Sequence, residues 1–267
     1  MITLAITNRK GGVGKTMFSI SLASLLAGLG YKVVLVDTDP QGNVAKWFDM
    51  PEESGIYDLL IKGTPLASLL KAPPQEFWWP EQTAGELLVL PGNYRTTTAG
   101  MVLAMNREPD DTLKGALRPL EYTQVDFVLI DTSPTVTPIQ ANVYVAADFA
   151  LIPTAPEMLS VNAVTKTIED INDKEVVETR GGPLAVIGVV PNKYQKVYAE
   201  HRAYLKELEH IFGEGLWPAV PYLVTFEKAP SLGKSIFAHA PRQKASQAVR
   251  ALGYHLLKRM DQEGVLA

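Results

Sequence analysis

The chain has 267 residues, which is enough for one large α/β domain with a substantial hydrophobic core. Hydrophobic residues make up 46% of it, charged residues 20% and cysteine none, which excludes disordered and fibrous classes, disulfides, cysteine-bound zinc and iron–sulfur clusters. The formal net charge is −4, so any contact with nucleic acid has to come from a local basic patch rather than from the chain as a whole.

Six short apolar runs are predicted to be β-strands, at residues 2–7, 32–37, 87–90, 125–131, 149–153 and 184–190. The runs are apolar throughout rather than alternating, and helical patterns separate them, as in the buried strands of a mostly parallel sheet. The sequence therefore predicts a doubly wound α/β fold with helices on both faces of the sheet. No linker divides the chain, so we expect residues 1–267 to form a single domain.

The chain begins directly with a predicted strand. It lacks the basic segment, the long apolar core and the small-residue cleavage site of a signal peptide. No apolar run approaches the roughly 20 residues that a membrane-spanning helix needs. We therefore expect a cytoplasmic protein without stable membrane insertion.

Residues 9–16, RKGGVGKT, join the first predicted strand to a predicted helix. The three glycines of this segment allow backbone turns that other residues resist, so successive N–H groups can point at phosphate oxygens. The start of the helix adds its positive dipole end. In such a loop Lys15 reaches the β- and γ-phosphates and the Thr16 hydroxyl ligates Mg²⁺.

Lys10 gives this loop a second lysine, and Arg9 stands where the usual pattern has its first glycine. Since Lys15 already serves the near side of the phosphates, Lys10 is expected to project from the opposite side of the loop. From there it could meet a nucleotide held by another copy of the protein.

Acidic residues end two of the predicted strands. The segment VLVDTDPQGN delivers Asp37 and Asp39 beside the phosphates, where one acid can help to hold hydrated Mg²⁺ and the other can orient the attacking water. The alternative is that Asp39 and the Pro-Gln-Gly after it only shape a turn. The segment VDFVLIDTSP ends its strand in Asp131, the pattern of an acid that holds Mg²⁺ through water.

These motifs together resemble the deviant phosphate loop, or Walker A motif, of the ParA/MinD family of partition ATPases, and of ParA/Soj-type proteins in particular. The stretches LLVLPGN, LIPTAPEMLSV, GVVPNKY and VPYLVTFEKAPSLGKSIFAHAP extend the resemblance over almost the whole chain. One departure is Ser133, because the family usually has D-x-P-P where this chain has D-T-S-P. The change affects the switch loop and leaves the metal role of Asp131 intact.

The resemblance implies a Mg²⁺-dependent ATPase whose two copies sandwich ATP, with the first lysine reaching across the dimer. The implied catalytic residues are Lys10, Lys15 and Asp39, the last orienting water. The implied Mg²⁺ residues are Thr16, Asp37 and Asp131. The resemblance also implies that Asn192 touches adenine and that the segment after Pro221 lines the base. The full set of implied ATP contacts is Lys10, Gly11, Gly12, Val13, Gly14, Lys15, Thr16, Met17, Asn192 and Pro221.

Three functions stay open. A ParA-like ATPase would bind DNA without sequence preference, associate with the nucleoid when ATP-bound, respond to a ParB-like or other small activator protein, and segregate or position a plasmid, a chromosome region or another cargo. A MinD-like membrane-surface ATPase would need a basic amphipathic C-terminal helix, whereas this tail continues into acids and favours a packed helix. A metabolic P-loop enzyme would have no need for Lys10.

The basic residues do not lie where DNA-binding relatives have them, because residues 222–225 read Tyr-Leu-Val-Thr instead of including arginines. Other basic residues are candidates for a displaced DNA patch, and the alternative for each is a solvated helix face. The main candidates are Lys234, Arg242, Lys244 and Arg250. A second cluster consists of Lys193, Lys196 and Arg202.

Residues 50–84 are rich in proline, glycine and polar side chains, and we interpret them as an irregular insertion at the periphery of the sheet. The aromatic triplet Phe77, Trp78 and Trp79 is either a partner-binding knob or a lid folded back over the edge of a helix. We favour the lid, since exposed aromatic clusters are unfavourable in water.

Overall fold

The computed structural model describes residues 1–52, 54–105, 111–135, 137–157 and 160–266. Within these residues, six strands form one parallel sheet in the order β3-β2-β4-β1-β5-β6. Their bounds are β1 Ile2–Ile6, β2 Lys32–Asp37, β3 Glu86–Leu90, β4 Phe127–Asp131, β5 Phe149–Thr154 and β6 Ala185–Pro191. All six predicted strands are confirmed, and no end differs from its predicted position by more than two residues.

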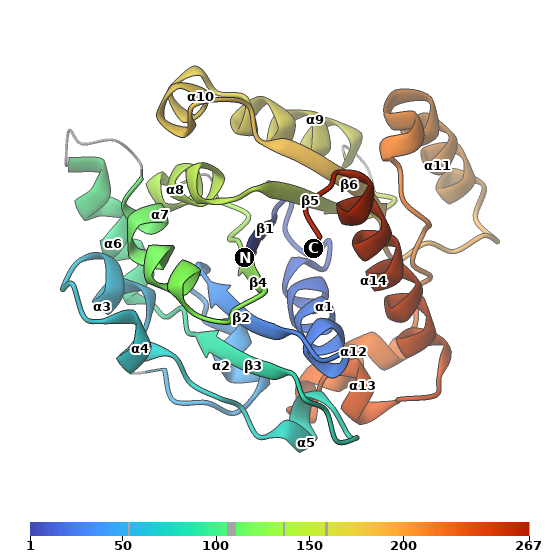
Figure 1. Ribbon diagram of the computed structural model, residues 1–267. Coiled ribbons are helices and arrows are strands. Elements are labelled where there is room, and N and C mark those ends of the chain that lie inside the picture. Colours follow the sequence, from blue (N-terminus) through green and yellow to red (C-terminus); the bar gives the residue numbers. More distant parts are fainter. Residues whose placement is uncertain (53, 106–110, 136, 158–159, 267) are drawn as a thin grey trace.

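Helices cover both faces of this sheet, which confirms the doubly wound α/β prediction (Figure 1). The α-helices are α1 Lys15–Gly28, α2 Asn43–Trp47, α3 Ile56–Leu60, α4 Leu66–Leu69, α5 Gln75–Trp78, α6 Arg95–Met105, α7 Thr112–Leu117, α8 Pro138–Ala146, α9 Ser160–Ile171, α10 Lys174–Arg180, α11 Ala199–Phe212, α12 Val224–Ser231, α13 Ile236–His239 and α14 Lys244–Gln262. Two short 3₁₀ helices are η1 Arg118–Tyr122 and η2 Gly213–Gly215.

The two hydrophobic layers follow from the alternation of side chains along the strands. In β1, Leu4 and Ile6 point to the layer shared with α1, α13 and α14, whereas Ala5 points to the layer shared with α3, α6, α7, α8 and α9. Helix α14 approaches α1 closely, because a Cβ on Gly253 would lie 2.2 Å from the Leu25 side chain. Parallel strands covered on both faces account for the unbroken apolar runs in the sequence.

The order of the strands positions the loops that carry the predicted motifs. Strand β1 lies between β4 and β5, and β2 lies on the other side of β4. The carboxyl ends of β1, β2 and β4 therefore meet at one edge of the sheet, with Asp131 in register with both Ile6 and Asp37. Ligands of open α/β sheets bind at this edge.

Among the described residues, no helix combines the length and the apolar character that crossing a bilayer requires.

The expected irregular insertion contains the short helices α3, α4 and α5. Trp78 and Trp79 are only 4% and 5% exposed, and the Trp79 ring packs against Phe237 with 5.1 Å between ring centroids. The same ring lies over Gly28 of α1, where an added Cβ would come within 2.4 Å of it. The lid interpretation is therefore confirmed, and the alternative of a partner-binding knob is wrong.

Because Trp79 fills a closed space between α1 and α13, Trp79→Ala should lower the free energy of unfolding by about 3–5 kcal/mol. Tyr122→Ala is the control, since Tyr122 is 79% exposed and its truncation should change stability by no more than about 0.5 kcal/mol. Urea unfolding followed by circular dichroism measures both. Equal effects of the two substitutions would contradict the packing role of Trp79.

Candidate functional site

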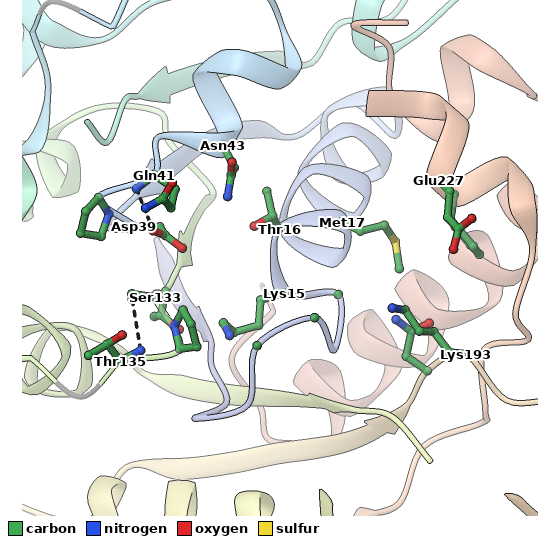
Figure 2. A pocket seen from close by; sticks show the side chains of 18 of the residues that line it. Lys15, Thr16, Met17, Asp39, Gln41, Asn43, Ser133, Thr135, Lys193 and Glu227 are labelled. Atoms are coloured by element: carbon green, nitrogen blue, oxygen red, sulfur yellow. Dashed lines mark hydrogen bonds between the residues drawn. The ribbon is translucent and has the colours of Figure 1, made fainter. Parts of the chain in front are cut away.

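A pocket of about 650 Å³ opens at the carboxyl edge of the sheet (Figure 2). Its walls come from the loops after β1, β2 and β4, from the end of β6 and from α12. This volume lies in the range of ligand and cofactor sites. Of the residues predicted to bind ATP, those lining the pocket are Gly11, Gly12, Gly14, Lys15, Thr16, Met17, Asn192 and Pro221.

The loop between β1 and α1 has the backbone shape that the glycines predicted. Gly12 and Gly14 have φ angles of 75° and 99°, the left-handed region that residues with a Cβ rarely adopt. A Cβ on Gly14 would also lie 2.4 Å from the Asn192 amide nitrogen. The Asn192 amide donates to the Val13 carbonyl at 2.8 Å, so the end of β6 braces the loop.

Lys15 points back along the inner side of this loop. Its Nζ donates to the carbonyls of Asn8 at 2.9 Å and Lys10 at 3.2 Å. Burial lowers the pKa of Lys15 to about 8, while nearby Asp131 and Asp39 favour the charged form. A buried cation that is held by neutral carbonyls is ready to neutralise a bound anion.

Asp131 is fully buried at the end of β4 and organises the start of α1. It accepts hydrogen bonds from Thr16 Oγ1 at 2.7 Å and from Ser19 Oγ at 2.9 Å. Burial raises the pKa of Asp131 to about 6. Ser19 escaped the sequence analysis because a serine one turn inside a helix carries no motif of its own.

Asp37 is fully buried in register with Asp131, at the end of the neighbouring strand. Its two carboxylate oxygens accept the backbone N–H groups of Asp39 at 2.9 Å and Val44 at 3.1 Å. Burial and the charge of Asp131 raise the pKa of Asp37 well above its usual range. The contacts of Asp37 thus shape the loop after β2, and its predicted place in the magnesium shell stays a prediction.

Asp39 lines the pocket and also takes part in a turn. Its Oδ1 accepts the Gln41 backbone N–H at 2.8 Å, and its carbonyl accepts that of Gly42 at 3.0 Å. The sequence offered a turn at Asp39 as an alternative to a role in the site, and the turn is present. The Asp39 carboxylate nevertheless lies in the wall of the pocket. Across the pocket, Ser133 Oγ accepts the Thr135 backbone N–H at 3.1 Å, which shapes the loop after β4 (Figure 2).

These residues fit a magnesium ion that arrives with a phosphate ligand. Asp37 and Asp131 are two buried carboxyl groups at the ends of neighbouring strands, and both have raised pKa values. A bound cation would favour the ionised form of both groups. Among the described residues, no three His, Cys, Asp or Glu side chains gather closely enough to bind a metal ion. The remaining ligands would have to be the Thr16 hydroxyl, phosphate oxygens and water, which is how Mg²⁺ is commonly held.

Lys10 leaves the loop on the other side, as the sequence predicted. Its Nζ lies 2.8 Å from Glu157 Oε2 and donates to Ser160 Oγ at 2.9 Å. Its backbone N–H donates to the Asn8 side chain at 2.8 Å. The two lysines of the loop therefore point to different surroundings, Lys15 to the phosphate-loop interior and Lys10 to the region around the start of α9.

Another part of the pocket wall comes from residues late in the chain and from the start of α1. Met17, Asn192 and Pro221 lie in it, and the predicted adenine contact of Asn192 stays a prediction. Sequence reasoning missed several side chains here because they reach the pocket from the turn after β6, from the segment before α12 and from α12 itself. These additional lining residues are Lys193, Tyr222, Leu223, Phe226 and Glu227, of which Figure 2 labels Lys193 and Glu227.

The four main DNA candidates have unequal surroundings. Arg242 and Lys244 are exposed at the start of α14, and Lys234 is half-buried in the turn before α13. Arg250 lies over the rings of Trp79 and Phe237, 5.0 Å from each centroid, so its guanidinium covers the aromatic lid. Arg242 and Lys244 thus form an exposed basic pair, whereas Arg250 is stacked on aromatic rings, and the sequence did not indicate this difference in packing.

A protein-family model described as an AAA domain, AAA_31, matches residues 1–179. The chromosome-partitioning ATPase Soj of Thermus thermophilus is 33% identical over 267 residues, which covers 97% of this chain and 96% of Soj. The match spans both the phosphate loop and the end of the pocket formed by β6 and α12.

Two solved structures share the fold. An ATP complex of a Cyanothece McdA variant superposes with a TM-score of 0.80 at 22% identity, covering 96% of each chain. Cobyrinic acid a,c-diamide synthase from Mycobacterium smegmatis, with a bound ATP analog and magnesium, gives a TM-score of 0.80 at 24% identity, covering 99% of this chain and 97% of the synthase.

The family model, the similarity to Soj along nearly the full length and the two-lysine phosphate loop agree with one another. This chain belongs to the ParA/MinD family of partition ATPases, which are P-loop ATPases.

Proposed function

We propose that the protein is a ParA-like ATPase that binds ATP and Mg²⁺, forms an ATP-sandwich homodimer, binds DNA without sequence preference, and segregates or positions a plasmid, a chromosome region or another cargo. The observation that carries this proposal is the divergence of the two loop lysines. Lys15 stays with the loop that would hold phosphates, whereas Lys10 extends to Glu157 and Ser160 outside it. A second lysine directed away from the phosphate-loop interior serves a second copy of the protein better than its own pocket.

The residues of the pocket supply the parts that phosphoryl transfer needs. The loop N–H groups and the Lys15 ammonium bind and neutralise phosphate oxygens, and the Thr16 hydroxyl is held by Asp131 at 2.7 Å. Mg²⁺, when bound, neutralises charge that develops on the phosphoryl oxygens. The Asp39 carboxylate in the pocket wall orients the attacking water. A ParB-like or other small activator protein would stimulate the reaction by completing this arrangement.

Two alternatives find less support. For a MinD-like membrane-surface ATPase, the apolar face of α14 would have to be available, but it packs on the core through Val249, Leu252, Leu256 and Met260. For a metabolic P-loop enzyme, the fold shared with the diamide synthase is compatible, but Lys10, which points away from the phosphate-loop interior, has no use in such chemistry. The similarity to Soj is also higher in sequence identity than the similarity to the synthase.

ATP affinity should depend on the charge of Lys15. Because the pKa of Lys15 is lowered to about 8, the ammonium is charged below that pH and loses its proton above it. Wild-type affinity for ATP, measured by calorimetry, should therefore fall between about pH 7 and 9.5, approaching tenfold per pH unit well above pH 8. Lys15→Ala should bind ATP weakly, fail to dimerise and show no such pH dependence. Near-native ATP affinity of this variant would contradict the site.

Dimerisation and hydrolysis should separate at Lys10 and Asp39. Lys10→Ala should bind ATP as a monomer, because its loop still holds phosphates but lacks the side chain that would reach the second copy. Asp39→Ala should bind Mg-ATP and remain a dimer, because the water is no longer oriented. Light scattering with ATP measures both, with Lys174→Ala as the control at a side chain that is 87% exposed. A Lys10→Ala protein that dimerises like wild type would refute the cross-subunit role.

The ATP-bound dimer, and neither the apo nor the ADP form, should bind duplex DNA of arbitrary sequence at low salt. Dimerisation aligns two copies of a weak basic patch, and each phosphate that is neutralised releases counterions. Substituting Lys234, Arg242 and Lys244 by alanine, while keeping Arg250 on its aromatic rings, should flatten the salt dependence. A mobility-shift assay with the Asp39→Ala dimer tests this. Absence of DNA retention at low salt would exclude nucleoid association of the ATP-bound state.

A further inference from the structure

The residue before Lys10 is anchored to α9 at two points. The backbone N–H of Arg9 donates to Thr167 Oγ1 at 3.1 Å. Its guanidinium donates through Nε and Nη2 to both carboxylate oxygens of Asp170, three residues further along the helix. Such a forked pair fixes the direction of the arginine as well as its position.

The Arg9–Asp170 pair is shielded from water more than an ordinary surface ion pair. The side chains are 35% and 15% exposed, and the hydrogen bond to Asp170 raises the pKa of Arg9 above its usual value. Exposed pairs such as Lys174–Glu178, whose side chains are 87% and 68% exposed, contribute little because water competes for both charges. The Arg9–Asp170 pair is therefore the stronger restraint.

This restraint acts on the backbone that carries Lys10. Arg9 is bonded directly to Lys10, and Asn8 on its other side donates to the Pro153 carbonyl at 2.8 Å while accepting the Lys10 N–H. Lys10 Nζ then reaches Ser160, at the opposite end of α9 from Asp170. Helix α9 thus holds Arg9 with its last turn and the tip of Lys10 with its first.

The rest of the loop depends on other elements. Lys15 donates to loop carbonyls, Thr16 to Asp131, and Asn192 braces the Val13 carbonyl from β6. The Thr16 hydroxyl and the backbone at Val13 are therefore fixed from β4 and from the end of β6, whereas the Lys15 ammonium also depends on the carbonyls of Asn8 and Lys10. The direction of Lys10 is fixed by β5 and α9.

We propose that Asp170 is a positioning residue which, through Arg9, sets the direction of Lys10 for its contact with the nucleotide of a second copy. This inference rests on the proposed cross-subunit role of Lys10. Arginine is needed at position 9 because lysine is a point charge and cannot occupy both oxygens of Asp170 in a fixed fork.

The test is Asp170→Asn, which keeps the shape of the side chain and removes its charge. The control is Glu178→Gln on α10, which makes the same change in net charge at an exposed pair. Asp170→Asn should weaken ATP-dependent dimerisation about five- to tenfold in ultracentrifugation and leave the affinity of the monomer for ATP within about twofold, as expected when one charged hydrogen-bond partner is lost. The control should change neither quantity.

A second measurement reads the position of Lys10 directly. Acylation of nucleotide-free protein, quantified by mass spectrometry, should modify Lys10 several-fold faster in Asp170→Asn than in wild type, with Lys174 as the internal reference. The charge-swapped protein with Arg9→Asp and Asp170→Arg should recover slow labelling and much of the dimerisation, because it restores an ion pair at the same place.

Unchanged labelling of Lys10 in Asp170→Asn would overturn the proposal, and so would equal losses of ATP affinity and of dimerisation, since these would mean that the whole loop is loosened. The proposed function is tested separately from the role of Asp170. If Lys10→Ala dimerises like wild type, the cross-subunit role fails, whereas the labelling experiment still decides whether Asp170 positions Lys10.

Discussion

The burial of the Asp131 carboxylate at the end of β4 is the constraint on which the site depends. A carboxyl group without solvent contact is unfavourable unless hydrogen bonds or a cation compensate for the lost water. Here Thr16 and Ser19 supply those bonds, and in doing so they tie the first turn of α1 to the strand between β1 and β2. The start of α1, and with it the phosphate loop, is thereby set relative to Asp37 and the loop after β2.

The phosphate loop is held by two different parts of the molecule. On one side, α1 and β4 fix the residues that would face phosphate. On the other, β5 and α9 hold residues 8–10 through Asn8 and Arg9. A change that moves α9 acts on Lys10 directly, and it reaches Lys15 only through the carbonyls of Asn8 and Lys10 that accept its ammonium. The two lysines of the loop thus have different supports, the start of α9 for the tip of Lys10 and the loop carbonyls for Lys15.

The pocket itself is assembled from both ends of the chain. The phosphate loop lies near the N-terminus, while Asn192 directly follows β6, Pro221 lies in the segment before α12, and Phe226 belongs to α12. They meet because β5 pairs with β1 and β6 pairs with β5, although both strands follow β1 by more than a hundred residues. The C-terminal helix α14 packs on α1 and buries its apolar face in the hydrophobic layer that α1 shares with the sheet.

The sequence by itself determined the six strands, the phosphate loop, and the acids at the ends of β2 and β4, because unbroken apolar runs and glycine spacing act locally along the chain. It also indicated that Lys10 and Lys15 diverge. Only the tertiary structure decided that Asp37 bonds to backbone N–H groups, that Ser19 joins Asp131, and that Asp170 meets Arg9. These contacts join residues whose separation in sequence carries no periodic signal, so their pairing depends on the order of the strands and on which helix faces are buried.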